Sequence, residues 1–134
     1  MNIGAAAKKS GLSVKTVRFY SDIGLISPDK STESNYRIYS NQDVEKLLFV
    51  GKARKFDFSI EECRELLSLY ENKERPSSEV KKITLKKIEE IEQRMAELNS
   101  LKTELKRVSR NCNGDQRPDC PIIGFLAETN GQTE

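Results

Sequence analysis

Two cysteines near the C-terminal end, Cys112 and Cys120, are the side chains of this sequence best suited to chemistry. Two turn signals stand between them, Asn113-Gly114 and Arg117-Pro118, and they predict a loop that brings the two sulfur atoms together. A pair of thiols in one short loop favours either a soft metal ion or a reversible disulfide.

The cellular compartment bears on this choice. The N-terminus lacks the apolar core of a signal peptide, and no apolar run approaches the ~20 residues that cross a membrane. We therefore expect the protein in the cytoplasm, where thiols stay reduced. A structural disulfide is disfavoured, and metal binding and redox chemistry remain as the two interpretations.

A short helix is predicted directly after the loop, from Pro121 to Leu126 or Ala127, because proline is favoured at the first helical position. Cys120 would stand before this helix, where unpaired backbone N–H groups favour a thiolate over a thiol. We assign residues 112–127 to the loop with its short helix and residues 128–134 to a flexible tail.

The loop must be positioned by the longest helical pattern of the sequence, which we place at residues 78–111 after a hinge at residues 72–77. No glycine or proline interrupts the pattern. Its apolar residues recur at heptad spacing, which is typical of a coiled coil. One helix cannot bury so narrow a stripe, so we expect a homodimer. The stripe consists of Thr84, Ile88, Ile91, Met95, Leu98, Lys102 and Leu105.

The first residues of the chain predict a pair of short helices. Asn2 and Ser13 are suitable N-caps for helices at residues 3–9 and 14–23, which a glycine turn would join. Such a pair is typical of the helix-turn-helix, whose second helix enters the major groove of DNA. The second helix has two faces: Lys15, Thr16 and Arg18 are polar, and Val14 and Val17 can turn to the core.

A turn and a strand follow. The polar run from Asp29 to Asn35 predicts a turn, and the alternation from Tyr36 to Tyr39 predicts a strand, as in the wing of a winged helix. Arg37 is placed to pair with a phosphate, and Tyr36 is placed to hydrogen-bond one. For Tyr39 we favour packing in the core.

Two further helices complete a domain over residues 1–71. Each starts at a capping box, Ser40 to Asp43 for the first and Ser59 to Glu62 for the second, and they are predicted to end near Phe56 and at Glu71. The inward residues are expected to be Val44, Leu47 and Leu48 on the first helix, and Ile60, Cys63, Leu67 and Tyr70 on the second. Cys63 is therefore assigned to the core.

Composition and charge fit this division. Only 36% of the residues are hydrophobic and there is no tryptophan, so we expect no large self-contained core. Residues 1–58 carry ten Lys/Arg and six Asp/Glu, whereas the remainder carries thirteen and fifteen. A basic first part on a nearly neutral chain fits a module that faces phosphates.

Several blocks of the sequence resemble the MerR family of transcriptional regulators. These are Arg18-Phe19-Tyr20, Gly24-Leu25, Pro28, Tyr36-Arg37-Ile38-Tyr39, the long helix and the Cys-x7-Cys loop. Cys112 to Cys120, followed by Pro121-Ile122-Ile123, resembles the copper-efflux branch of the family, which senses monovalent metals. The resemblance extends to about Leu126.

The resemblance implies a mainly α-helical fold, with a winged helix-turn-helix domain followed by an antiparallel dimerisation helix and a metal-binding loop. It implies a homodimeric activator that binds double-stranded promoter DNA and, when it holds metal, distorts the DNA for RNA polymerase. Cys112 and Cys120 would be the metal ligands, and Ser77 would stand where divalent-metal sensors have a third cysteine. The implied DNA contacts are Lys15, Thr16, Arg18, Tyr20, Tyr36 and Arg37.

Three departures from the family pattern affect the DNA-binding domain. Ser31 stands near a position where arginine is frequent, and Lys30 is placed to supply that charge instead. Asn35 stands where glycine is frequent, and because asparagine tolerates a left-handed conformation we expect the wing to form. Ser21 stands where glutamate is frequent.

The absence of histidine narrows the chemistry further. Without histidine the chain can form neither a Cys2His2 zinc site nor a Cys-His or Ser-His catalytic dyad, and no enzyme site is predicted. Two thiolates alone suit linear coordination of soft monovalent ions, Cu(I), Ag(I) or Au(I). The alternative is a DNA-binding redox switch that uses a Cys112–Cys120 disulfide.

Overall fold

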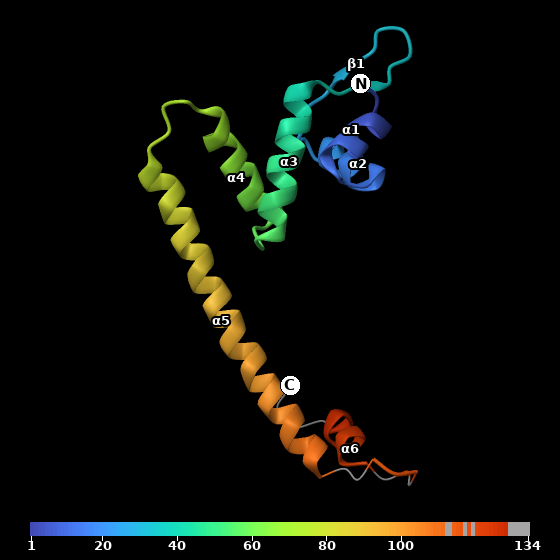
Figure 1. Cartoon of the computed structure of the whole chain (residues 1–134), viewed down its shortest axis with the longest axis vertical. Helices are drawn as coiled ribbons and strands as arrows, with labels where there is room; N and C mark the ends of the chain where they lie inside the picture. The colour runs from blue at the N-terminus through green and yellow to red at the C-terminus, as the bar shows by residue number, and fades with distance from the viewer. Residues whose placement is uncertain (112–113, 117, 119, 129–134) are drawn as a thin grey trace. The chain divides into compact units, whose positions relative to one another are not determined.

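The computed structural model describes residues 1–111, 114–116, 118 and 120–128. Within this part of the chain the structure is mainly helical, with six helices and one two-stranded sheet (Figure 1). The chain forms two compact units, Met1–Lys87 and a second unit that begins at Ile88. No helix among the described residues is long and apolar enough to cross a membrane.

The predicted helix pair is confirmed. Helix α1 spans Ile3–Ser10, and the side chain of Asn2 caps it by accepting a hydrogen bond from the N–H of Ala5. Gly11 ends α1 in the left-handed conformation, with φ of 74°. Helix α2 spans Val14–Asp22 and is capped by Ser13.

The wing is a short antiparallel ribbon. Strand β1, Asp29–Lys30, pairs with strand β2, Arg37–Ile38, and Lys30 lies opposite Arg37. The second strand was predicted, whereas β1 falls in the run that we expected to be only a turn. Asn35 lies in the connecting turn with φ of 62°, so it does take the left-handed conformation for which glycine is frequent in the family.

Helices α3 and α4 begin at the two predicted capping boxes. Helix α3 spans Asn41–Lys55, and Ser40 and Asp43 exchange hydrogen bonds at its start. Helix α4 spans Ile60–Glu71, and Ser59 and Glu62 do the same. Each box satisfies two backbone N–H groups that a helix start otherwise leaves without partners, which is why the sequence located these starts well.

The core of the first unit joins helices α1 to α4 and the end of the wing. It is formed by Ala6, Ala7, Val17, Tyr20, Leu25, Ile26, Tyr39, Val44, Leu47, Val50, Cys63 and Leu67. The burial of Tyr39 and of Cys63 confirms the assignment of both residues to packing.

Three predicted core residues are exposed instead. Leu48 is 49% exposed, because it lies about 100° around the helix from Leu47, and Val50 fills the core in its place. Tyr70 stacks on the ring of Phe49, with centroids 4.7 Å apart, but it covers the edge of the core and stays partly exposed. Val14, in the first turn of α2, is also exposed, and Val17 alone of the two valines is buried.

The long helix α5 spans Ser77–Arg110, and Figure 1 shows it without a break. It begins at Ser77, the residue that we had placed last in the hinge. Inside the first unit, Lys87 of α5 forms an ion pair with Glu62 of α4 at 2.9 Å, and its ammonium group lies 5.5 Å from the centre of the Phe58 ring.

In the second unit the short helix α6, Pro121–Ala127, lies against the C-terminal end of α5. The guanidinium group of Arg107 lies 6.0 Å from the centre of the Phe125 ring, and Val108 is buried. Most of the apolar stripe of α5 is exposed to solvent, namely Ile88, Met95, Leu98 and Leu105, together with Leu101.

Candidate nucleic-acid interface and metal-binding loop

The outer face of α2 carries the cations that the sequence assigned to it. Lys15 and Arg18 are exposed, while Val17 and Tyr20 hold the opposite face of the helix in the core. Thr16 accepts a hydrogen bond from the hydroxyl of Ser13 at 2.9 Å, so it also helps to fix the helix start. A rigid helix that presents two cations outward is suited to the negatively charged groove of DNA.

Phe19 lies on the same outer face and was missed by the sequence analysis. Phe19 is 48% exposed, and it follows Lys15 by four residues, which places the two side chains next to each other on the helix. Large exposed aromatic rings are uncommon on a surface, and the i, i+4 spacing from Lys15 was the signal that would have located it.

The structure brings Arg18 together with the two predicted wing residues. A surface hollow of about 440 Å³ is lined by Asn2, Ile3, Arg18, Asp22, Asn35, Tyr36 and Arg37. Tyr36 is 77% exposed at this edge, so both its ring and its hydroxyl group are available to a ligand. The hollow therefore combines two guanidinium groups with an accessible tyrosine, a set that suits the phosphates of a nucleic acid.

Arg37 also has an acidic neighbour that the sequence did not reveal. Its Nη2 donates to the carboxylate of Asp22 at 2.6 Å, and this hydrogen bond raises the pKa of the guanidinium group above its ordinary value. The two residues are fifteen positions apart, and no local pattern predicts that contact.

The two other tyrosines differ from Tyr36. Tyr39 is buried, and its hydroxyl group lies 2.8 Å from the hydroxyl group of Ser21. Tyr20 is only 6% exposed, so its ring is a part of the core. A contact between Tyr20 and a phosphate remains a prediction, and only the edge of the residue is available for it.

The cysteine loop is described in part. Cys112 lies outside the described residues, so the distance between the two predicted metal ligands is not defined by this structure. Cys120 is half-buried and forms the N-cap of α6, with Pro121 at the first helical position, as the sequence predicted. Among the described residues there is no cluster of three or more potential metal ligands. Ser77 is exposed at the start of α5.

Cys63 is the one cysteine whose role the structure defines fully. Its side chain is completely buried, and its sulfur lies 4.0 Å from the carbonyl oxygen of Phe58. Burial raises the pKa of this thiol, which opposes the thiolate form that binds metals. Cys63 is therefore a core residue.

The fold and this basic face define a winged helix-turn-helix DNA-binding protein. The model of the MerR HTH family regulatory proteins matches residues 1–69, and a second model, described as MerR, DNA binding, matches residues 44–108. The chain belongs to the MerR family of transcription regulators, and it is not an enzyme.

Relatives of this chain cover almost its whole length. It is 47% identical over 132 residues to the heavy metal-dependent transcription regulator 2 of Rhizobium meliloti, covering 98% of this chain and 90% of the relative. It is 43% identical over 127 residues to the HTH-type transcriptional regulator CueR of Yersinia pestis, covering 95% and 91%.

A solved structure is similar over the same range. The transcription regulator PbrR691 from Ralstonia metallidurans, in complex with lead(II), superposes with a TM-score of 0.79 and 34% identity. The match covers 95% of this chain and 99% of PbrR691.

Proposed function

We propose that this regulator senses the monovalent coinage-metal ions Cu(I), Ag(I) and Au(I) through Cys112 and Cys120, and activates transcription by remodelling promoter DNA. The observation that carries the proposal is the burial of Cys63. The sequence contains three cysteines and no histidine, and the core holds one of the three. Apart from methionine thioethers, the thiols of Cys112 and Cys120 are then the only soft metal ligands that remain.

The number of soft ligands favours monovalent ions. Lead(II) and zinc(II) gain from a third or fourth ligand, whereas two thiolates complete a linear site for Cu(I) or Ag(I). The relatives include a regulator described as heavy metal-dependent, a regulator named CueR and a regulator solved in complex with lead(II), so they do not by themselves distinguish the ions. The family resemblance implies that divalent-metal sensors have a third cysteine at the position of Ser77. Serine at this position supports a site with two ligands.

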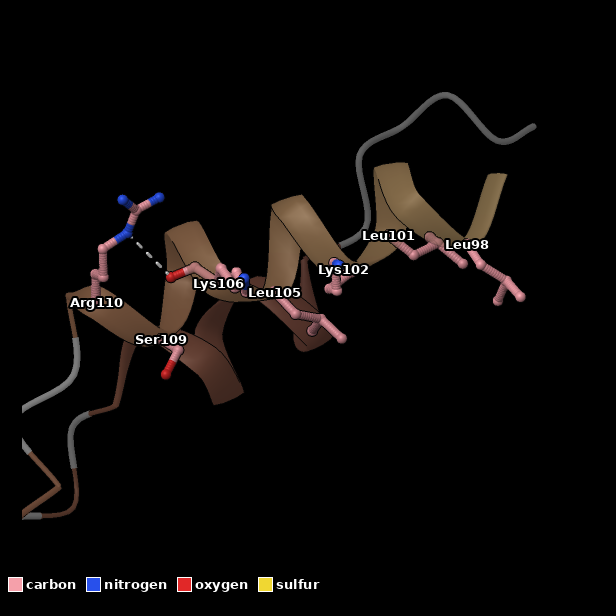
Figure 2. Close-up of a pocket in the computed structure, with 7 residues that line it drawn as sticks. All are labelled: Leu98, Leu101, Lys102, Leu105, Lys106, Ser109 and Arg110. Carbon is pink, nitrogen blue, oxygen red and sulfur yellow. Dashed lines mark hydrogen bonds between the residues drawn. The ribbon is translucent and has the colours of Figure 1, made fainter. Parts of the chain in front are cut away.

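The same proposal includes a homodimer that acts on DNA together with RNA polymerase in the cytoplasm. The exposed stripe of α5 supports the dimer, because an apolar groove of about 760 Å³ runs along Leu98, Leu101 and Leu105 (Figure 2). Figure 2 shows these three side chains projecting from successive turns of the helix. Exposed leucines at heptad spacing are stabilised when a second helix covers them.

The test is a metal titration of the reduced protein against a strong Cu(I) chelator. We expect about one Cu(I) or Ag(I) per subunit, and loss of this binding in Cys112→Ser and in Cys120→Ser. Cys63→Ser is the matched control, because it removes a thiol from the core and should leave the stoichiometry unchanged. Both loop variants should still bind duplex DNA.

Two further arms of the titration separate the alternatives. Tight zinc(II) or lead(II) binding with no response to Cu(I) would contradict the monovalent assignment. Activation of transcription by an oxidant in metal-free buffer, dependent on both loop cysteines, would instead support the redox switch.

A further inference from the structure

Two neighbouring residues at the end of α2 are tied to the wing. The hydroxyl group of Ser21 lies 2.8 Å from that of Tyr39, and the carboxylate of Asp22 accepts the hydrogen bond from Arg37 at 2.6 Å. Tyr39 is buried, so the first tie anchors the base of the wing to the core. The second tie lies at the surface, where it fixes the direction of a long and otherwise flexible cation.

The geometry leaves Arg37 able to hold a second anion. The hydrogen bond with Asp22 engages only one of the two terminal amino groups of the guanidinium, Nη2. The side chain of Arg37 is 32% exposed, and it lines the same hollow as Arg18 and Tyr36. The Tyr39 side chain also interacts with this guanidinium group. A planar guanidinium group held at one nitrogen by a carboxylate can present its remaining exposed N–H groups to a phosphate in a fixed orientation.

We propose that Asp22 is a positioning residue for DNA binding: it orients Arg37 toward a backbone phosphate at the junction of the recognition helix and the wing. This inference rests on the proposed DNA-binding role of Arg37. It assigns a favourable role to an acidic side chain that lies close to a polyanion.

Two physical effects of opposite sign decide what removal of Asp22 would do. Its negative charge repels DNA, so simple electrostatics predicts that its loss strengthens binding. This repulsion is weakened by water and salt because Asp22 is 53% exposed. Its hydrogen bond, by contrast, removes the rotational freedom of Arg37 before DNA arrives. We infer that the second effect is larger, so that loss of the acid weakens binding.

The test measures binding to a fluorescein-labelled duplex of mixed sequence at several salt concentrations. Asp22→Ala should weaken binding about tenfold, Asp22→Asn less, and Asp22→Glu should restore affinity close to that of the wild type. The slope of log K against log[salt] should become shallower by nearly one in Asp22→Ala, as expected when one phosphate contact is lost. In an Arg37→Ala background, Asp22→Ala should have no further weakening effect.

Glu33→Gln is the matched control. Glu33 is exposed in the turn of the same wing, and its side chain contacts no cation within the described part of the chain. Its neutralisation removes the same charge without affecting Arg37, and should leave binding unchanged or slightly tighter. Thermal unfolding of each variant shows whether the domain is folded, and Asp22→Asn, which has nearly the same shape as the wild-type side chain, serves if Asp22→Ala does not fold.

Three results would overturn the proposal. These are tighter binding by Asp22→Ala, a loss that persists unchanged in the Arg37→Ala background, or an unaltered salt slope. If Arg37→Ala itself bound DNA like the wild type, the proposed role of Arg37 would fail together with this inference. If Asp22→Ala weakened DNA binding as expected but the protein did not bind Cu(I), this inference would stand and only the metal assignment would be contradicted.

Discussion

Arg18 and Arg37 reach the same surface hollow from different elements, α2 and β2. Each is expected to neutralise one phosphate, because arginine pairs with phosphate in a bidentate manner and keeps its charge at every relevant pH. We therefore expect DNA binding to depend most directly on these two residues.

We predict that Arg18→Ala and Arg37→Ala each weaken binding to duplex DNA, by about tenfold at moderate salt, and reduce the salt slope by about one. Fluorescence anisotropy across a salt series measures both quantities. Lys82→Ala, which removes an exposed cation from α5, is the control and should leave the slope unchanged. Equal slopes in the arginine variants and in the wild type would remove these residues from the interface.

At the scale of the element, the capping box of α4 has a second role. Glu62 caps the helix and also pairs with Lys87 of α5. Burial alone would raise the pKa of Glu62, but hydrogen bonds from the backbone N–H of Ser59 and from the Lys87 ammonium outweigh burial and hold the pKa below its ordinary value of 4.5. The charged form is therefore the one that the folded state favours.

This shift predicts an acid-sensitive contribution to stability. A carboxyl group whose pKa is lower in the folded state contributes stability above its unfolded pKa, and the contribution is lost as the pH falls through the folded pKa. Between about pH 5 and about pH 3 the wild type should lose roughly 1 kcal/mol more unfolding free energy than Glu62→Gln. Urea unfolding at a series of pH values measures this difference.

Glu65→Gln provides the control for that experiment. Glu65 is exposed on the same helix, so its variant should keep the acid sensitivity of the wild type. If Glu62→Gln retained the full pH dependence, the ion pair with Lys87 would not contribute to it.

Local signals in the sequence were sufficient for most elements. The caps at Asn2, Ser13, Ser40 and Ser59 located four helix starts, because a capping side chain lies within a few residues of the N–H group that it satisfies. Strand β1 was missed because its two residues, Asp29 and Lys30, are both charged and show no alternation of apolar and polar side chains.

Contacts between distant residues were beyond sequence reasoning. Helical spacing shows on which side of a helix Leu48 and Tyr70 lie, but it does not show where the core ends on that side. Both residues lie at that boundary and are exposed. The pairing of Asp22 with Arg37 depends on how the wing folds back on α2, which no short-range pattern records. The roles of Cys112 and Cys120 come from their spacing and from family resemblance, and they remain predictions.

At the scale of the whole molecule, the apolar stripe of α5 determines the expected assembly. Leu98 and Leu105 are both at least half exposed in the single chain, and they lie seven residues apart, on the same face of the helix. A second helix would bury both.

We predict that Leu98→Glu combined with Leu105→Glu converts the dimer into a monomer and weakens DNA binding severely, because each head alone reaches only one half-site. Sedimentation equilibrium measures the assembly. Ser100→Glu places one glutamate on the opposite face of α5 and should leave the proposed dimer intact, as each single leucine variant can be compared with it at equal charge. A double leucine variant that remained dimeric would exclude this stripe as the interface.

The burial of Cys63 also affects which thiols of the protein can compete for a metal ion. Soft metal ions move between proteins by exchange from one thiolate to another, and every accessible thiol is a competing acceptor. Cys63 has no exposed surface and its thiol resists ionisation, so it cannot capture an arriving ion while the domain is folded. A metal ion that binds through a cysteine thiolate therefore finds no competing thiol in the DNA-binding domain. Metal bound to thiols of this chain would then be metal bound in the loop.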